Sequence, residues 1–195
     1  MKIKILICIV YLAFSICALA QQLSDCDFPP AQLLHQPRRE FHGLYTNNAY
    51  GGYSVEIPDG LVGYDDKNPF YQRGFGIILG KKEHDYIDVN AEVNGLEYKN
   101  SISVINSRIE YMHDRGDQIE SSTITETFMG KLQASALEIT YTCPVKKERI
   151  IQYSVFALSP DKRFIYKITL YSIISRYKNN RSFLEKILRT WKYNG

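Results

Sequence analysis

Hydrophobic and polar residues alternate with a period of two along much of this chain, the pattern that predicts β-strands with one buried face. The clearest early segment is 53–57, which ends at Pro58-Asp59-Gly60. A compact apolar run over 75–79 and an alternating run over 86–93 predict two more strands. Four further strands are predicted at 122–131, 134–142, 149–158 and 164–173. Short connections join these four, so neighbouring strands are expected to be antiparallel.

The middle of the chain changes to a spacing of three and four residues, which is typical of a helix with one apolar face. The apolar positions that carry this spacing are Ile102, Ile105, Ile109 and Met112. Asn100 or Ser101 is a suitable N-cap, because its side-chain oxygen can accept a hydrogen bond from a free N–H of the first turn. Gly116 is a suitable stop signal.

A second helix is predicted at the end of the chain, with Asn180 or Ser182 as its N-cap. Its broad apolar face comprises Phe183, Leu184, Ile187, Leu188 and Trp191. We expect Leu188 and Trp191 to dock this helix on the sheet. The predicted fold class is therefore α+β, an antiparallel β-sheet covered by an internal and a C-terminal helix.

Two parts of the chain lack a regular pattern. Residues 21–52 read as an irregular N-terminal lead-in, because prolines and paired glycines interrupt them. Residues 63–74 read as a long polar and aromatic loop. The predicted organisation is a signal peptide at 1–20, the lead-in, and a single α+β domain over 53–195.

Several segments fit one known architecture when taken in order. They are Ile57-Pro58-Asp59-Gly60, the glycine-flanked strand 75–80, Leu158-Ser159-Pro160, and the final helix with Ile187-Leu188 before Trp191. This order resembles the Mog1/PsbP-like fold over residues 53–193. The resemblance implies an adaptor or accessory domain, because members of that family are mostly binding proteins without catalytic residues. It transfers no functional residue, since the shared motifs are structural.

The first twenty residues have the organisation of a secretory signal peptide. Lys2 and Lys4 precede an apolar run, and Ala18-Leu19-Ala20 supplies a small-x-small cleavage pattern. The alternative is a permanent membrane anchor, but the run is shorter than the roughly 20 residues that a spanning helix needs. We therefore expect a periplasmic or secreted protein, in a bacterial host, without an integral membrane segment after cleavage.

Charge gives no reason to expect nucleic acid as a partner. The chain has 24 basic and 21 acidic residues, a formal net charge of +3. The signal segment holds two of the lysines and no acid, so the remainder carries +1. A nearly neutral chain lacks the strong positive field that attracts nucleic acids and anionic membranes.

Two cysteines remain outside the signal segment, Cys26 and Cys143. In an oxidising compartment they can form one disulfide, which would tie the lead-in to the body of the domain. The alternative is a pair of free thiols. Two cysteines and four scattered histidines do not make a closed zinc site at any recognised spacing.

No motif for nucleophilic catalysis or phosphate binding occurs in the chain, so we predict no catalytic residue and no cofactor. We also predict no metal site, and interpret residues 81–85 as a charged turn that enters a strand. The best candidates for a metal site are His84 and Asp88, with Glu83 and Asp85 nearby. His84 and Asp88 would share one face of the strand, and with Asp65 or Asp66 they could bind a divalent ion.

The loop 63–74 is the most promising binding surface, and it has no counterpart in the family that the chain resembles. It interleaves aromatic and charged residues, which are common in interface hot spots. The candidate residues are Tyr64, Asp65, Asp66, Phe70, Tyr71 and Arg73. The alternative is that Phe70 and Tyr71 simply pack on the sheet.

Two functional hypotheses follow. The first is an exported, non-enzymatic binding or accessory protein that contacts a protein partner in the envelope. The second is a small ligand carrier or hydrolase with a pocket between sheet and helix. A tightly filled interface between sheet and helix would count against the second hypothesis.

Overall fold

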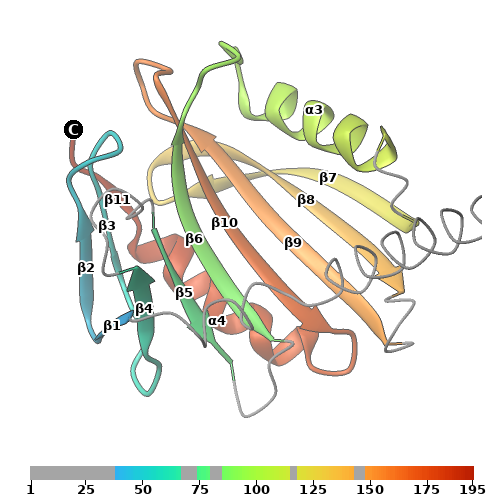
Figure 1. Ribbon diagram of the computed structural model, residues 1–195, viewed down its shortest axis with the longest axis horizontal. Helices are drawn as coiled ribbons and strands as arrows, with labels where there is room; N and C mark the ends of the chain where they lie inside the picture. Colours follow the sequence, from blue (N-terminus) through green and yellow to red (C-terminus); the bar gives the residue numbers. More distant parts are fainter. Residues whose placement is uncertain (1–37, 67–73, 80–84, 115–117, 143–147) are drawn as a thin grey trace, which may run out of the picture.

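The computed structural model describes residues 38–66, 74–79, 85–114, 118–142 and 148–195. An eight-stranded antiparallel sheet forms its body, in the order β1-β4-β5-β6-β10-β9-β8-β7 (Figure 1). The bounds in that order are Arg38–Phe41, Gly63–Asp66, Gly74–Ile78, Tyr86–Val93, Phe164–Ile173, Arg149–Leu158, Leu132–Thr142 and Ile119–Met129. The strands predicted from alternation all occur, with ends that differ by at most three residues.

A second, smaller sheet lies beside the first. It has the order β11-β3-β2, with bounds Lys192–Tyr193, Tyr53–Glu56 and Leu44–Asn47. Helix α3 (Ser101–Asp114) packs on β8 and β9, and helix α4 (Tyr177–Thr190) packs on β10 and β3. The two helices lie on opposite faces of the large sheet (Figure 1). This arrangement confirms the predicted α+β class.

Aromatic side chains fill much of the contact between α4 and the sheet face that it covers. Trp191 is 2% exposed, and its ring stacks on Tyr53 with a centroid separation of 5.9 Å and an interplanar angle of 14°. Tyr166 lies against the same indole, at 4.7 Å between centroids. Leu188 is also buried in this cluster. The predicted docking of the last helix through Leu188 and Trp191 is therefore confirmed.

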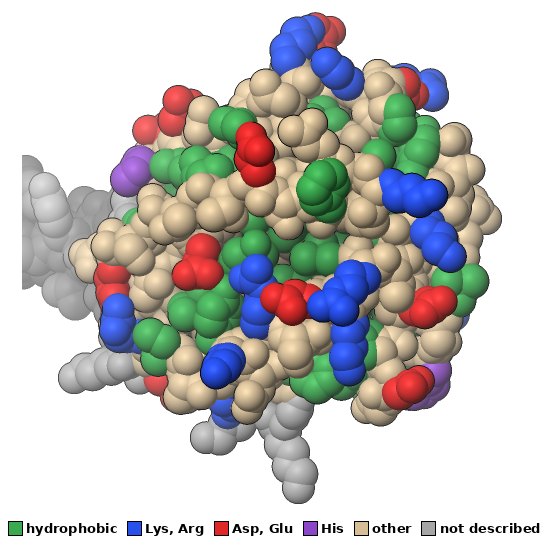
Figure 2. All heavy atoms as spheres, turned by 180° about the vertical axis from the view of Figure 1, so that it is seen from behind, with side chains coloured by type: hydrophobic (Ala, Val, Ile, Leu, Met, Phe, Trp, Pro, Cys, Tyr) green, Lys and Arg blue, Asp and Glu red, His purple; other side chains and the backbone are tan. Residues whose placement is uncertain are grey.

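The outer face of α4 is charged, as amphipathic burial requires. Figure 2 shows this side of the molecule, where basic and acidic side chains are interspersed. Glu185 pairs with Arg181 at 3.5 Å and with Arg189 at 3.9 Å, both at i,i+4 spacing. Arg181 also lies 3.4 Å from the centroid of the Tyr153 ring. The helix is thus held on the sheet by its polar edge as well as its apolar face.

Helix α3 confirms the predicted cap. Asn100 Oδ1 accepts a hydrogen bond from the N–H of Ser103 at 2.9 Å, which satisfies a free donor of the first turn. The helix packs on the opposite face of the sheet through Val104, Ile105 and Met112. Ile102, which the sequence placed on the apolar face, is 42% exposed and is not part of this contact. Gly116, the predicted stop, lies outside the described residues.

The predicted start of α4 is wrong by about one turn. The helix begins at Tyr177, and its N-cap residue, Arg176, makes no side-chain cap. Asn180 is instead buried inside the helix, where its Nδ2 donates to Ser172 Oγ at 2.9 Å. Asp85 explains the earlier start, because its buried carboxylate pairs with Arg176 and accepts the Ile173 N–H at 3.0 Å. A contact from Asp85, the residue that precedes β6, therefore holds the first turn in place of a local cap.

The expectation of an irregular lead-in up to residue 52 is also wrong in part. Residues 38–41 and 44–47 form β1 and β2, which join the large and the small sheet respectively. Strand β1 pairs with β4, where Arg39 Nη2 contacts Asp65 Oδ2 at 2.5 Å. These short strands depend on distant partners, so local alternation does not reveal them.

Some predictions fall on residues outside the described part of the chain. The signal segment 1–20, Cys26 and Cys143 are among them, so the signal peptide and the disulfide stay predictions. Within the described part, no helix combines the length and apolar character needed to cross a membrane.

Candidate functional site

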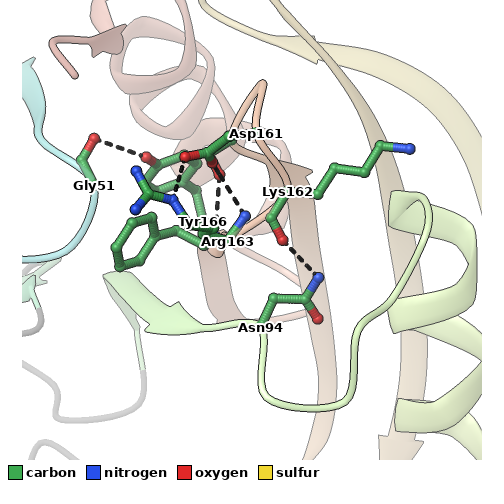
Figure 3. A network of polar contacts seen from close by, with 8 residues as sticks. Gly51, Asn94, Asp161, Lys162, Arg163 and Tyr166 are labelled. Carbon is green, nitrogen blue, oxygen red and sulfur yellow. Dashed lines mark hydrogen bonds and ion pairs between the residues drawn. The ribbon is translucent and has the colours of Figure 1, made fainter.

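An open cleft of about 510 Å³ lies at one end of the large sheet. Two connections form its walls, the β6–α3 loop and the β9–β10 hairpin, and the β2–β3 turn lies beside the hairpin (Figure 3). The cleft is lined by Val93, Asn94, Glu97, Tyr98, Lys99, Asp161, Lys162, Arg163 and Phe164. Loops held at one end of a rigid sheet are common positions for binding sites.

Asn94 joins the two loops that form the walls of the cleft. Its Nδ2 donates to the carbonyl of Tyr98 at 3.0 Å and to the carbonyl of Lys162 at 2.8 Å. Its Oδ1 accepts the N–H of Tyr98 at 2.9 Å, and its own N–H donates to the carbonyl of Arg163 at 2.8 Å. Asn94 is buried, and these bonds satisfy both polar groups of its side chain and its own N–H. The cleft is therefore built around a fixed backbone.

The β9–β10 hairpin is fixed by Ser159 and Asp161. Ser159 Oγ donates to Asp161 Oδ1 at 2.6 Å and accepts the N–H of Phe164 at 3.0 Å. Asp161 also accepts the N–H of Arg163 at 3.1 Å and pairs with its guanidinium. The hydrogen bond from Ser159, followed by those from Arg163, lowers the pKa of Asp161 to about 2. This carboxylate stays ionised at neutral pH and is a very weak base.

The β2–β3 turn approaches the same end of the sheet through a glycine. Tyr166 Oη donates to the carbonyl of Gly51 at 3.1 Å (Figure 3). Gly51 has φ +70°, and a Cβ there would lie 2.5 Å from the Phe164 ring and 2.6 Å from Tyr166 Oη. Only glycine combines this conformation with so close a contact. Burial also raises the pKa of Tyr166, so its hydroxyl remains a hydrogen-bond donor.

The charged groups around the cleft differ in whether they are already ion-paired within the chain. Arg163 is paired with Asp161, although its side chain is 76% exposed. Lys99, Lys162 and Glu97 are exposed at the rim. Val93 adds an exposed apolar side chain. The cleft thus combines a fixed floor with exposed side chains of both charges and some apolar surface, the composition of a binding surface.

The structure places only part of the predicted binding loop. Tyr64, Asp65 and Asp66 lie on β4, whereas Phe70, Tyr71 and Arg73 fall outside the described residues. Asp65 is 1% exposed and is held by Arg39, so it supports the sheet edge and does not present a free carboxylate. The strand that follows, β5, starts at Gly74 opposite Asn90 of β6. This register directs the start of β5 toward the end of the sheet that carries the cleft.

The metal hypothesis receives no support from the described residues. Asp88 faces Lys167 across neighbouring strands, with 3.5 Å between Oδ2 and Nζ. Burial lowers the pKa of Lys167, but Asp88 and Tyr171 oppose this effect, and the net result is a raised pKa. Asp85 is paired with Arg176. His84 and Glu83 are not described, and the described residues hold no group of three or more metal-ligating side chains.

The sequence patterns did not identify the cleft residues as a site. Asn94-Gly95 and Ser159-Pro160-Asp161 carry turn signals, and both do form connections between elements. The hydrogen bond from Asn94 to Lys162 requires two connections about seventy residues apart in the chain to meet. No local sequence pattern predicts such a contact.

The interfaces between sheet and helices are filled. Under α4, the described core contains Tyr53, Tyr166 and Trp191 in mutual ring contact. Under α3, Ile105 and Phe156 are buried in a second apolar cluster. These side chains occupy the space between sheet and helix in the described residues around them. The hypothesis of a carrier or hydrolase with its pocket between sheet and helix stays a prediction.

The large antiparallel sheet with a helix on each face is the Mog1/PsbP-like fold, as the sequence resemblance indicated. A solution structure of the cyanobacterial PsbP protein (CyanoP) from Synechocystis sp. PCC 6803 is similar, with a TM-score of 0.53 and 13% identity. The likeness covers 79% of this chain and 94% of CyanoP. At this identity it defines the fold and not the function.

Two further solved structures are more distant. LpqN of Mycobacterium tuberculosis, which is involved in cell envelope biogenesis, has a TM-score of 0.45 and 9% identity over 83% of this chain and 94% of its own. PA94 of Pseudomonas aeruginosa, a protein of unknown function, has a TM-score of 0.44 and 9% identity over 76% of this chain and 95% of its own. At these TM-scores, neither structure adds to the fold assignment. No protein-family model and no curated protein matches the chain.

Proposed function

We propose that this protein is an exported, non-enzymatic binding protein that captures a protein partner in the bacterial envelope. The cleft at the end of the large sheet is its proposed contact site. The compartment is inferred from the pattern of residues 1–20, and the mode of action from the cleft.

One observation carries the proposal: hydrogen bonds fix the backbone of the cleft, while lysine side chains at its rim are exposed. Asn94 and Ser159 hold the two walls through buried or partly buried hydrogen bonds. Lys99 and Lys162 remain exposed on those walls. A surface that is ordered before binding loses less conformational entropy when a partner arrives, so more of the contact energy contributes to affinity.

The chemistry of the cleft favours binding over catalysis. Asp161 is the best-placed carboxylate, but a pKa of about 2 makes it too weak a base to take a proton at neutral pH. Its hydrogen bonds with Ser159 and Arg163 also occupy the oxygens that a substrate would need. The cleft residues therefore suit recognition of shape and charge.

The part of the predicted loop that follows β4 in the sequence, residues 67–73, belongs to the same proposal. Its two flanking strands, β4 and β5, are described, and Gly74 starts β5 opposite Asn90, near the end of β6 that leads into Asn94. We propose that Phe70, Tyr71 and Arg73 extend the contact surface beyond the cleft. Aromatic and arginine side chains are the residues that most often dominate the binding energy of an interface.

The experiment is site-specific photo-cross-linking in the native host. A photoreactive amino acid replaces Lys99 or Lys162 at the rim of the cleft, and Lys178 on the outer face of α4 serves as the matched control, since all three lysines are exposed. We expect the same discrete protein adduct from both cleft positions and none from Lys178. The purification tag is placed at the mature N-terminus. A tag at the other end could disturb the hydrogen bond that the Asn194 N–H donates to the carbonyl of Gly52, near the cleft.

The outcomes separate the two functional hypotheses. Adducts that are equal at all three positions, or absent at both cleft positions, would contradict the proposed site. A small molecule retained in native mass spectrometry, together with the absence of a protein adduct, would instead favour the ligand carrier.

A further inference from the structure

Strand β7 forms a long edge of the large sheet in the part of the chain that the structure describes (Figure 1). It runs from Ile119 to Met129, is the last strand in the order, and pairs only with β8 among the described elements. Every residue from 120 to 126 is exposed. An edge strand presents a row of unpaired backbone N–H and C=O groups, which form a template for another strand.

The usual protections against edge pairing are weak on β7. The strand contains no proline and no lysine, and its irregularity is confined to the first residues, between Ile119 and Ser121. It carries two acidic residues, Glu120 and Glu126. Glu120 is already paired with Arg149, whose Nη2 lies 2.8 Å from Glu120 Oε2, so its charge is largely balanced within the chain. Glu126 is the remaining charge that could oppose pairing.

We propose that β7 pairs with β7 of a second copy of this chain, antiparallel and centred on Ile124. This register pairs the regular part of the strand, because Ile124 is the midpoint of residues 121–127 as well as of 119–129. A two-fold axis then passes beside Ile124, and the pairing is isologous, as in most homodimers. The two eight-stranded sheets join edge to edge into one continuous sheet.

The side chains are complementary in this register. Ile124, which is 41% exposed, meets its own copy and loses contact with water. On the other face of the strand, Thr123 meets Thr125 of the second copy, and Ser121 meets Thr127. Pairs of threonine and serine hydroxyls across strands are favourable, because each can donate to the other.

The charges are also compatible with this register. Glu126 lies opposite Ser122 of the second copy, four residues along the strand from the other Glu126. Four residues of β-strand span about 13 Å, whereas the screening length at physiological salt is about 8 Å. A register centred on Glu126 would place the two carboxylates face to face, and like charges directly opposite are unfavourable. The sequence therefore selects the central register over that alternative.

The first test is the mass of the purified protein by sedimentation at rising concentration. We expect a monomer–dimer equilibrium for the wild type. Ile124→Lys places two lysines face to face at the two-fold axis, and we expect it to raise the dimer dissociation constant roughly tenfold or more. Leu44→Lys is the matched control, because Leu44 is also an exposed apolar residue on an edge strand, β2 of the small sheet. It should leave the equilibrium unchanged.

The second test measures the register and does not depend on a disruptive substitution. In Ile124→Cys, the two new thiols lie directly opposite, so mild oxidation should give a covalent dimer. In Ser122→Cys, the two thiols lie four residues apart, and no new covalent dimer should form beyond that of the wild type. A wild type that remains monomeric at all concentrations would overturn the proposal. So would equal cross-linking of the two cysteine variants, or loss of the dimer in Leu44→Lys.

Discussion

The side-chain amide of Asn94 donates a hydrogen bond to the backbone carbonyl of Lys162, 68 residues further along the chain, at 2.8 Å. The same amide donates to the carbonyl of Tyr98, and its oxygen accepts the N–H of Tyr98. One buried side chain thereby joins the β6–α3 loop to the β9–β10 hairpin. The shape of the cleft depends on this link.

Asn94→Ala should lower the free energy of unfolding by about 1–3 kcal/mol, because it leaves the Tyr98 N–H and the Lys162 carbonyl without their partner. Urea denaturation measures this loss. Lys99→Ala, a surface substitution on the same loop, should change the stability by no more than about 0.5 kcal/mol. Equal effects of the two substitutions would show that Asn94 does not hold the loops together.

Gly130 provides a test of close packing at the β7–β8 turn. Its φ is +57°, and a Cβ would lie 2.0 Å from the carbonyl oxygen of Trp191. Gly130→Ala should therefore destabilise the protein by about 2 kcal/mol or more, from backbone strain and overpacking together. A loss of stability no larger than that of a glycine with free space around it would contradict this contact.

Two other glycines separate the causes in that measurement. Gly60 has φ +80° but no atom within 4 Å of a Cβ, so Gly60→Ala reports the strain alone, about 1 kcal/mol. Gly95 has neither feature, and Gly95→Ala should be nearly neutral or slightly stabilising. The urea midpoint should therefore be lowest for Gly130→Ala, intermediate for Gly60→Ala and highest for Gly95→Ala.

The stabilisation that ionised Asp161 gives its hairpin should decline progressively as the pH falls from about 3.8 to about 2. Hydrogen bonds lower the pKa of Asp161 from 3.8 to about 2, so the ionised form is favoured in the folded state. The resulting stabilisation is present above the unfolded value and is lost as the pH falls through about 2. Ser159 donates the bond with the largest effect.

Ser159→Ala should therefore raise the pKa of Asp161 toward its ordinary value. The carboxyl carbon shift in an NMR titration reports this pKa directly. Ser122→Ala on the distant β7 edge is the control and should leave the titration unchanged. An unaltered Asp161 pKa in Ser159→Ala would exclude Ser159 as the main cause.

Replacing Phe70, Tyr71 and Arg73 together by alanine should abolish partner capture and leave the melting temperature nearly unchanged. The reason is that interface hot spots stabilise the complex more than the free protein. Capture is measured on the adduct from the Lys162 cross-linker. Capture equal to that of the wild type would remove this loop from the site. A large fall in melting temperature would instead show that its aromatic rings pack on the sheet.

The sequence by itself determined most strands of the large sheet and the apolar face of each helix. Alternation at 86–93, 149–158 and 164–173 coincides with β6, β9 and β10. Trp191 and Leu188 are buried as their helical spacing predicted. These features are local, because the period of side chains along a strand or helix decides which residues face the core.

The tertiary structure alone decided the features that depend on distant partners. Strands β1 and β2 exist because β4 and β3 pair with them, and α4 begins early because Asp85 holds Arg176. The cleft likewise depends on contacts between connections that are far apart in the chain. Such contacts arise when the whole sheet closes, and the free energy that holds them comes from packing and hydrogen bonds that no short segment contains.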